Sequence, residues 1–159
     1  MSKNTKALEN LQQALSMELT AVHQYLMHAH VLDDWGLDRL AAKMREEMQE
    51  ELGHAGAFID RILFLKGDPR IEAGKTPRRA TSLEEMFKAD LAEEQGAIAF
   101  YTEAADAAAE ESDIGTRTLF EQTLLDEEGH SAWLELQLDL LERMGQGAYI
   151  AKHMSAPGD

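Results

Sequence analysis

Cysteine is absent from this chain of 159 residues. Its absence excludes disulfides, thiolate zinc sites and iron–sulfur clusters held by thiolates. The chain also lacks any run of 18 or more apolar residues, so no membrane span is expected. The N-terminus has none of the basic, apolar and small-residue segments of a signal peptide. We therefore expect a cytoplasmic protein that has no membrane partner.

Basic residues are scarce, with 15 Lys and Arg against 30 Asp and Glu, which gives a formal net charge of −15. A nucleic-acid-binding face needs a basic patch, so this balance argues against nucleic acid as a partner. The longest basic cluster, 75–79, is interrupted by Pro77. Strong acidity favours solubility or a surface that attracts cations, and charge alone does not separate the two.

Proline is equally rare, and both internal prolines fall in one segment, 67–81, which also holds Gly74. The rest of the chain is rich in Ala, Leu, Glu, Met and Gln, which are strong helix formers. Ser82 and Glu85 form a capping-box pattern, Asp113 suits a helix N-cap and Gly145 suits a helix end. The pattern predicts an all-α fold with four long helices and a short fifth one, over residues 5–34, 37–66, 83–111, 113–144 and 146–154.

A spaced set of two glutamates and a histidine occurs twice in this chain, with identical spacing in both copies. In each set a single Glu is followed, at the same distance, by a Glu-x-x-His motif. The members are Glu18, Glu51 and His54 in the first set and Glu94, Glu127 and His130 in the second. Each of the four glutamates fills a gap in the apolar stripe of one predicted helix. Buried unpaired carboxylates are costly, and metal coordination removes that difficulty.

Helix-hairpin geometry brings the two sets to one level. In both sets the midpoint between the two glutamates falls on a predicted turn, at 34–35 and at 110–111. Residues equidistant from the turn of an antiparallel hairpin share one height, about 25 Å from the turn here. The connection 67–82 is long enough to run the length of the bundle, which would make the second and third helices parallel. One Glu from each of two helices, with Glu-x-x-His from the other two, matches the pattern of di-iron carboxylate bundles.

Over essentially its full length the chain resembles the bacterioferritins. The stretches that carry the resemblance are Met17-Glu-Leu19, Gln24-Tyr25, Trp35-Gly-Leu37, Ile62-Leu-Phe-Leu-Lys-Gly67 and Asp126-Glu-Glu-Gly-His130-x-x-Trp133-Leu-Glu135. The resemblance implies a ferritin-like four-helix bundle with one long crossover, and we expect residues 1–159 to form a single domain of this kind. It also implies a 24-subunit hollow shell that stores ferric mineral.

The resemblance further implies a ferroxidase centre, which oxidises Fe(II) to Fe(III) with dioxygen or hydrogen peroxide. The six residues of the two sets match the family's iron ligands. By this resemblance Glu51 and Glu127 would bridge two irons, and Glu18 and Glu94 would be terminal ligands. Each histidine would complete one iron. Oxygen and nitrogen ligands with open positions suit iron in this role better than a closed zinc site. A ferredoxin-type reductase is a candidate partner.

One position departs from the family pattern. In haem-binding bacterioferritins a Met directly after the first bridging Glu ligates haem at a two-fold subunit interface, and here that position is Leu52. For Met48, one turn earlier, packing is favoured over a shifted haem ligand. We expect the homo-oligomer to bind little or no haem, while a shell mixed with a haem-binding paralogue would hold some. Glu46 and Glu50 match positions that bind iron on the cavity surface of some family members, or they form a solvated acidic face with Glu47.

Other residues are assigned to ordinary roles. Core packing is favoured over electron donation for Tyr25 and Trp133. His23, His28 and His30 lack a matching carboxylate pattern, so surface or interface roles are favoured.

The main alternative function is a rubrerythrin-like di-iron peroxidase, whose electron-transfer module needs cysteines. A purely structural bundle is a further alternative, but it would leave four carboxylates buried without a reason.

Overall fold

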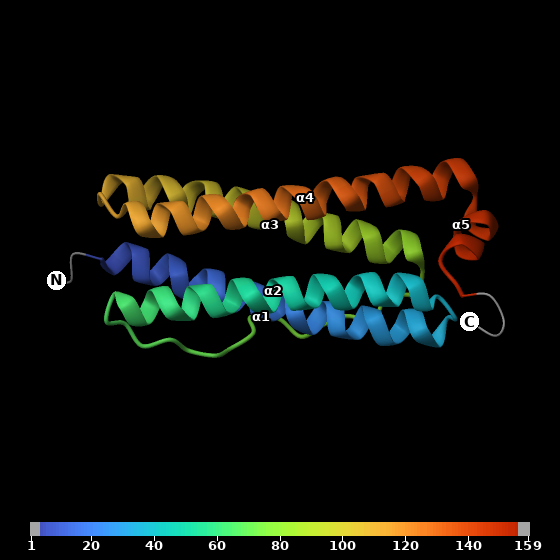
Figure 1. Ribbon diagram of the computed structural model, residues 1–159, viewed down its shortest axis with the longest axis horizontal. Coiled ribbons are helices and arrows are strands. Elements are labelled where there is room, and N and C mark those ends of the chain that lie inside the picture. The colour runs from blue at the N-terminus through green and yellow to red at the C-terminus, as the bar shows by residue number, and fades with distance from the viewer. Residues whose placement is uncertain (1–3, 156–159) are drawn as a thin grey trace.

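The computed structural model describes residues 4–155, which form five helices and no strand. The helices are α1 (Thr5–Asp34), α2 (Asp38–Phe64), α3 (Leu83–Glu110), α4 (Ile114–Met144) and α5 (Gln146–Lys152). Figure 1 shows α1 and α2 as one antiparallel hairpin, stacked on a second hairpin made of α3 and α4. The short α5 closes one end of the bundle. The predicted all-α bundle is confirmed.

The segment between Phe64 and Leu83 crosses the length of the bundle, so α2 and α3 run parallel, as the length of this connection predicts (Figure 1). Two glutamine side chains of α1 form hydrogen bonds with backbone groups of the crossover. The Gln12 side chain exchanges two hydrogen bonds of 2.9 Å with the backbone of Arg70. Gln24 does the same with the backbone of Arg78 at 2.8 and 2.9 Å. These pairs satisfy backbone groups that a helix or sheet would otherwise pair.

The helix ends follow local chemistry. The backbone N–H of Glu85 donates to Ser82 Oγ at 3.1 Å, as the capping box predicts. The Glu85 carboxylate, however, accepts from the N–H and hydroxyl of Thr81 and not from Ser82. Asp113 caps α4 by accepting from the Thr116 N–H, also at 3.1 Å. Gly145 leaves the helix at φ 78°, a conformation that glycine adopts without the Cβ penalty of other residues.

Three helices end slightly earlier than predicted, and α3 does so by a single residue, at Glu110. Helix α2 stops at Phe64 because Lys66 takes φ 66° and the Gly67 N–H bonds back to the Ile62 carbonyl at 2.8 Å. A Cβ at position 67 would lie 2.6 Å from Leu8 Cδ2, so any larger residue would have to displace the Leu8 side chain. Helix α5 ends at Lys152 and not at residue 154. The expected domain limits at residues 1–3 and 156–159 lie outside the described residues.

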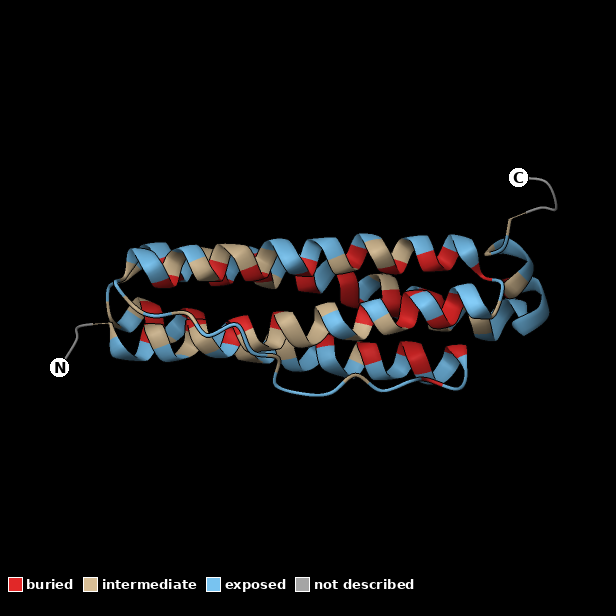
Figure 2. Cartoon of the chain, turned by 90° about the horizontal axis from the view of Figure 1, so that it is seen from below, coloured by how far each residue is buried: buried red, intermediate tan, exposed pale blue. Residues whose placement is uncertain are grey.

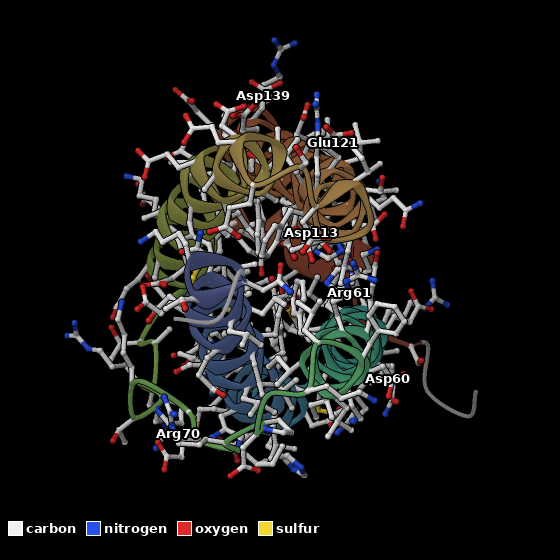
Figure 3. The ribbon with its side chains drawn as sticks, turned by 90° about the vertical axis from the view of Figure 1, so that its left-hand side faces the viewer. Asp60, Arg61, Arg70, Asp113, Glu121 and Asp139 are labelled. Carbon is white, nitrogen blue, oxygen red and sulfur yellow. The ribbon has the colours of Figure 1, made fainter. Side chains whose placement is uncertain are left out.

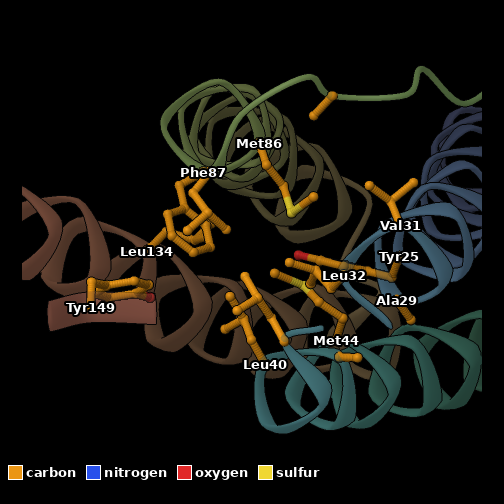
Figure 4. Close-up of a cluster of buried hydrophobic side chains, with 14 residues drawn as sticks. Tyr25, Ala29, Val31, Leu32, Leu40, Met44, Met86, Phe87, Leu134 and Tyr149 are labelled. Carbon is orange, nitrogen blue, oxygen red and sulfur yellow. The ribbon is translucent and has the colours of Figure 1, made fainter. Parts of the chain in front are cut away.

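The core consists of two apolar clusters separated by a polar layer. One cluster, near the α1–α2 turn, contains Leu32, Leu40, Met44 and Phe87 (Figure 4). The other lies toward the opposite end and contains Leu11, Leu15, Phe58, Tyr101 and Phe120. Figure 2 shows buried residues along the inward faces of the helices and exposed ones outside. The four glutamates of the duplicated sets lie between the two clusters.

The two hairpins are also linked at one end of the bundle. Arg61 of α2 donates from Nη2 to Asp113 Oδ1 at 2.7 Å and from Nε to Thr116 Oγ1 at 3.0 Å. Figure 3 shows Arg61 and Asp113 facing each other across the gap between the hairpins. Across residues 4–155, no helix is both long and apolar enough to cross a membrane.

Candidate metal centre

Six side chains of the two duplicated sets meet at the middle of the bundle. Four ligand atoms from Glu18, Glu51, His54 and Glu127 lie within 4.8 Å of one another, and so do four from Glu51, Glu94, Glu127 and His130. The four glutamates are at most 5 % exposed. Each of the four long helices contributes one glutamate near its midpoint. The structure therefore brings together all six residues that the spacing singled out.

The four carboxylates differ in which histidines they approach. Glu51 places Oε2 3.5 Å from His54 Nδ1 and Oε1 3.0 Å from His130 Nδ1. Glu127 does the reverse, with Oε1 3.3 Å from His54 Nδ1 and Oε2 3.3 Å from His130 Nδ1. These two carboxylates each turn one oxygen toward each histidine.

The other two carboxylates serve one histidine each. Glu18 Oε2 lies 3.5 Å from His54 Nδ1, and Glu94 Oε1 lies 3.8 Å from His130 Nδ1. The cluster thus divides into two halves that share Glu51 and Glu127. This division matches the donor arrangement expected for two adjacent cations, with two shared and two unshared carboxylates.

Several ligand atoms of the cluster have no hydrogen-bond partner although they are buried. They are Glu18 Oε2, Glu51 Oε1, His54 Nδ1, Glu94 Oε2 and Glu127 Oε1. A buried polar atom without a partner costs about 1–3 kcal/mol, and more when it is charged. Carboxylate oxygens and imidazole nitrogens that converge in this way suit a transition metal such as iron. The donor set therefore fits two metal ions.

Protons occupy part of this cluster when no metal is bound. Burial lowers the pKa of His54, but Glu127 and Glu51 outweigh this effect and raise the pKa to about 11. Burial raises the pKa of Glu94 to about 8, a shift that His130 opposes and Glu127 reinforces. Metal ligands must be deprotonated, so metal binding here displaces protons.

The outer ring nitrogens of both histidines contact carboxylates of the opposite hairpin. His54 Nε2 lies 2.8 Å from Asp126 Oδ2, and His130 Nε2 lies 2.8 Å from Glu50 Oε2. Glu47 Oε2 also approaches His130 Nε2, at 2.6 Å. Carboxylates in such positions orient a metal-binding imidazole and fix its tautomer. Sequence reasoning missed Asp126, although it directly precedes Glu127 just as Glu50 directly precedes Glu51.

The predicted solvated acidic face is therefore only partly correct. Glu46 is exposed and Glu50 is about half exposed, but Glu47 is buried and binds Lys43 at 2.9 Å. Glu47 lies on the inward side of α2 because it is one turn before Glu51. The prediction treated three neighbouring glutamates as one group, whereas a helix turns successive side chains by about 100°.

Two tyrosines contact the unshared glutamates. The Tyr25 hydroxyl donates to Glu94 Oε1 at 2.9 Å, and the Tyr101 hydroxyl donates to Glu18 Oε1 at 2.5 Å. Burial raises the pKa of both phenols well above the usual value, and nearby glutamates raise it further. Both hydroxyls therefore stay protonated and donate. Tyr101 follows Glu94 at the same distance as Tyr25 follows Glu18, a repeat that sequence reasoning did not use.

His28 corrects a further expectation. It is 2 % exposed, not on the surface, and its Nε2 lies 2.8 Å from Asp90 Oδ1 in α3. Burial raises the pKa of Asp90, while the contact with His28 opposes that shift. His23 and His30 are exposed, as expected. The carboxylate partner was missed because it lies far away in the sequence, on another helix.

Three residues assigned to haem or packing roles lie near the centre. Leu52 is 48 % exposed on α2, next to the shared Glu51. Met48 is half-buried and packs against the cluster near the α1–α2 turn. Trp133 packs edge-on against Phe87 with a centroid distance of 6.0 Å. The packing predictions for Met48 and Trp133 agree with these contacts.

A cavity of about 910 Å³ leads to the centre between α1, α3 and the crossover. Its inner end is lined by Glu18, Glu51, Glu94 and Glu127. Its outer end is lined by polar and basic residues of the crossover, which include Lys75 and Arg78. Small solutes can thus approach the buried carboxylates from this side.

A family model and individual relatives point to the same protein family. Residues 8–144 match the ferritin-like domain family. The chain is 43 % identical to a bacterioferritin of Rhodobacter capsulatus over 159 residues, which are 100 % of this chain and 98 % of that protein. It is 41 % identical to a bacterioferritin of Brucella melitensis, with the same coverage.

Solved structures agree with the sequence relatives. A structure of Rhodobacter capsulatus bacterioferritin, with a metal-free dinuclear site and a haem iron, matches at a TM-score of 0.95 and 40 % identity, covering 100 % of this chain and 99 % of that one. The Mycobacterium tuberculosis bacterioferritin BfrA matches at 0.94 and 36 % identity, with 99 % of both chains covered. The rubrerythrin-like alternative is not favoured by these relatives. The chain belongs to the ferritin-like family and, within it, to the bacterioferritins.

Proposed function

We propose that this iron-storage protein oxidises Fe(II) at the central cluster and passes the ferric product to a store enclosed by copies of the chain. Glu51 and Glu127 would bridge two iron ions, Glu18 and Glu94 would be terminal ligands, and each histidine would bind one iron through Nδ1. The observation that carries this proposal is the split of the cluster, in which two carboxylates face both histidines and two face one each. A single-metal site or a structural bundle requires no such sharing.

The chemistry follows from pairing two ions of substrate. Each Fe(II) gives up one electron, so two neighbouring ions supply the two electrons that hydrogen peroxide needs to become water, or that dioxygen needs to become peroxide. The four carboxylates offset the charge of two cations and favour the more highly charged ferric product. The outer-nitrogen contacts with Asp126 and Glu50 keep both imidazoles oriented toward the ions.

The proposal also covers how copies of the chain assemble and where in the cell they act. Bacterioferritins assemble into oligomeric shells, and we propose that this chain forms one of 24 copies in the cytoplasm. A ferredoxin-type reductase that releases stored iron is a proposed partner, and residues 1–159 are proposed to form one domain. Sedimentation of the purified protein is expected to give a mass near 24 times that of the 17.7 kDa chain. A dimer would contradict the shell.

Haem binding is proposed to be weak in the homo-oligomer. The residue after the first shared glutamate is Leu52, whose aliphatic side chain has no atom that can ligate iron. A paralogue with methionine at this position would supply haem sites to a mixed shell.

Addition of Fe(II) in air to the metal-free protein tests the proposed activity. Wild type is expected to oxidise two Fe(II) per chain in a fast phase. This phase is monitored by the light absorption of the ferric iron that forms. Glu94→Ala should lose this phase because one half of the centre lacks its unshared carboxylate. Glu93→Ala is the matched control, since Glu93 is the preceding residue on α3 and its side chain is 64 % exposed. Equal fast phases in wild type and Glu94→Ala would contradict the proposal.

A further inference from the structure

The internal repeat of the chain extends beyond the six candidate ligands to two tyrosines. Tyr101 lies as far after Tyr25 in the sequence as Glu94 lies after Glu18. Each hydroxyl crosses to the glutamate of the other hairpin, from Tyr25 to Glu94 and from Tyr101 to Glu18. The two contacts are therefore related by the same internal symmetry that relates the halves of the centre.

The rings of both tyrosines pack against apolar side chains. Tyr25 belongs to the apolar cluster near the α1–α2 turn, and Figure 4 shows it reaching from α1 into the space between the helices. Tyr101 belongs to the other cluster, where it stacks on Phe58 and Phe120 at centroid distances of 5.9 and 6.0 Å. The tyrosines thus approach the centre from opposite apolar clusters.

The contact with Tyr101 divides the two oxygens of Glu18. Oε1 accepts the hydrogen bond from the Tyr101 hydroxyl, while Oε2 is buried without a hydrogen-bond partner and faces His54. Glu94 differs, because its Oε1 both accepts from Tyr25 and is the oxygen that lies 3.8 Å from His130 Nδ1, while its Oε2 has no hydrogen-bond partner. A carboxylate oxygen that accepts a hydrogen bond from a phenol has less electron density to give a cation, so the contact favours coordination through the other oxygen.

We propose that Tyr101 is a positioning residue that confines Glu18 to one ligating oxygen at the half of the centre containing His54. Tyr25 has the corresponding contact with Glu94 at the other half. This role rests on the proposed metal centre. It does not require that the centre oxidise iron, so it is tested with a cation that stays divalent.

Titration of metal-free protein with Co(II) under anaerobic conditions tests this role through binding and visible absorption. Wild type is expected to bind two Co(II) per chain. In Tyr101→Phe the affinity for one ion should fall about tenfold, the size expected when one hydrogen bond to a charged group is lost. The absorption of that ion should change because Glu18 is free to rotate. The second ion should bind as before.

Further variants separate positioning from a loss of packing. In a Glu18→Ala background Tyr101→Phe should add no effect, whereas in a Glu94→Ala background its effect should persist. Tyr149→Phe is the matched control, because Tyr149 is buried and donates to Gln137 at 2.7 Å, away from the centre. The stacked ring is kept in Tyr101→Phe, so the unfolding temperature of the metal-free variant, compared with metal-free wild type, reports whether packing is intact.

The outcomes that would overturn the proposal fall into two groups. Unchanged Co(II) affinity and absorption in Tyr101→Phe, or an equal loss at both ions, would contradict the role of Tyr101 while leaving the centre intact. Failure of the wild-type chain to bind two Co(II) would contradict the proposed centre itself, and this role with it.

Discussion

Leu52 shows how one side chain separates two properties of the family. It follows the shared Glu51 on α2, and its side chain points outward while that of Glu51 points inward. A substitution here is therefore expected to change what this exposed surface binds without altering the buried centre. The proposed loss of haem and retention of iron oxidation are therefore independent.

Leu52→Met is expected to create haem binding in the homo-oligomer. A thioether at this position supplies an iron ligand that leucine lacks. Reconstitution with hemin should give a bis-thioether spectrum in the variant and little haem in wild type. Leu63→Met is the matched control, because Leu63 lies on the same helix and is 51 % exposed. A stoichiometric haem spectrum in wild type would contradict the assignment.

His28 and Asp90 form a buried pair that joins the two hairpins near the centre. Replacement of His28 by leucine leaves the Asp90 carboxyl buried without its partner, which should lower the free energy of unfolding by about 1–3 kcal/mol. The double change His28→Leu with Asp90→Leu should cost less than the sum of the single changes. Denaturant unfolding of the four proteins measures this coupling, and strict additivity would show that the contact contributes nothing.

The helix hairpins convert spacing along the chain into position in space. Both hairpins turn midway between their two glutamates, so all four carboxylates reach the same height. The turns themselves depend on special backbone positions, with Gly36 at φ 82° in one hairpin and Ser112 at φ 59° in the other. Turn geometry thus sets the register of the centre.

The start of α4 is expected to show a pH-dependent contribution to stability. Burial raises the pKa of Asp113, but hydrogen bonds from Thr116 and Arg61 outweigh it and hold the pKa below its usual range. A lowered carboxyl pKa stabilises the fold above the pKa of the unfolded chain, about 3.9, and that contribution is lost as the pH falls through the lower folded value.

Asp113→Asn keeps a good N-cap and removes the charge. It should cost about 1 kcal/mol at pH 7, and the difference from wild type should shrink below about pH 4. Urea unfolding at both pH values measures this. Asp139→Asn is the control, since its pair with Arg143 is on the surface and should contribute little at either pH. A difference that stays constant with pH would argue against the Arg61–Asp113 pair.

In the bundle as a whole, the polar layer at the centre opposes folding of the metal-free chain. Two apolar clusters supply the burial energy at either end, while the layer between them holds four carboxylates and two histidines. The stability of the metal-free fold therefore comes from the two apolar clusters. Metal binding should stabilise the folded state, because only the folded chain presents the complete donor set.

Divalent metal is expected to raise the unfolding temperature. A ligand at a hundred times its dissociation constant stabilises by about 2.7 kcal/mol, which corresponds to roughly 5–10 °C for a chain of this size. Calorimetry with Co(II), and again after EDTA, should show the rise and its reversal. Glu127→Ala should abolish the rise, whereas Glu128→Ala should retain it because Glu128 is exposed. An equal rise in both variants would show that the metal binds elsewhere.

Prediction from the pattern of residues succeeded where local rules decide the outcome. The four long helices follow from composition and capping, and the central glutamates follow from a repeat interval that matches helix-hairpin geometry. It failed where the partner lies on another helix. Asp90, Asp126 and Glu47 are ordinary acidic residues in the sequence, and only packing of the hairpins brings them to His28, His54 and His130.

The amino-acid sequence by itself determined the class of fold, the level at which the glutamates meet and the identity of the six candidate ligands. Tertiary structure decided which oxygen of each glutamate faces which histidine, and which tyrosine holds which carboxylate. The physical reason is that periodicity specifies the face and height of a side chain on its own helix. The contacts made by an individual atom depend instead on the packing of four helices and on the side-chain rotamers that this packing allows.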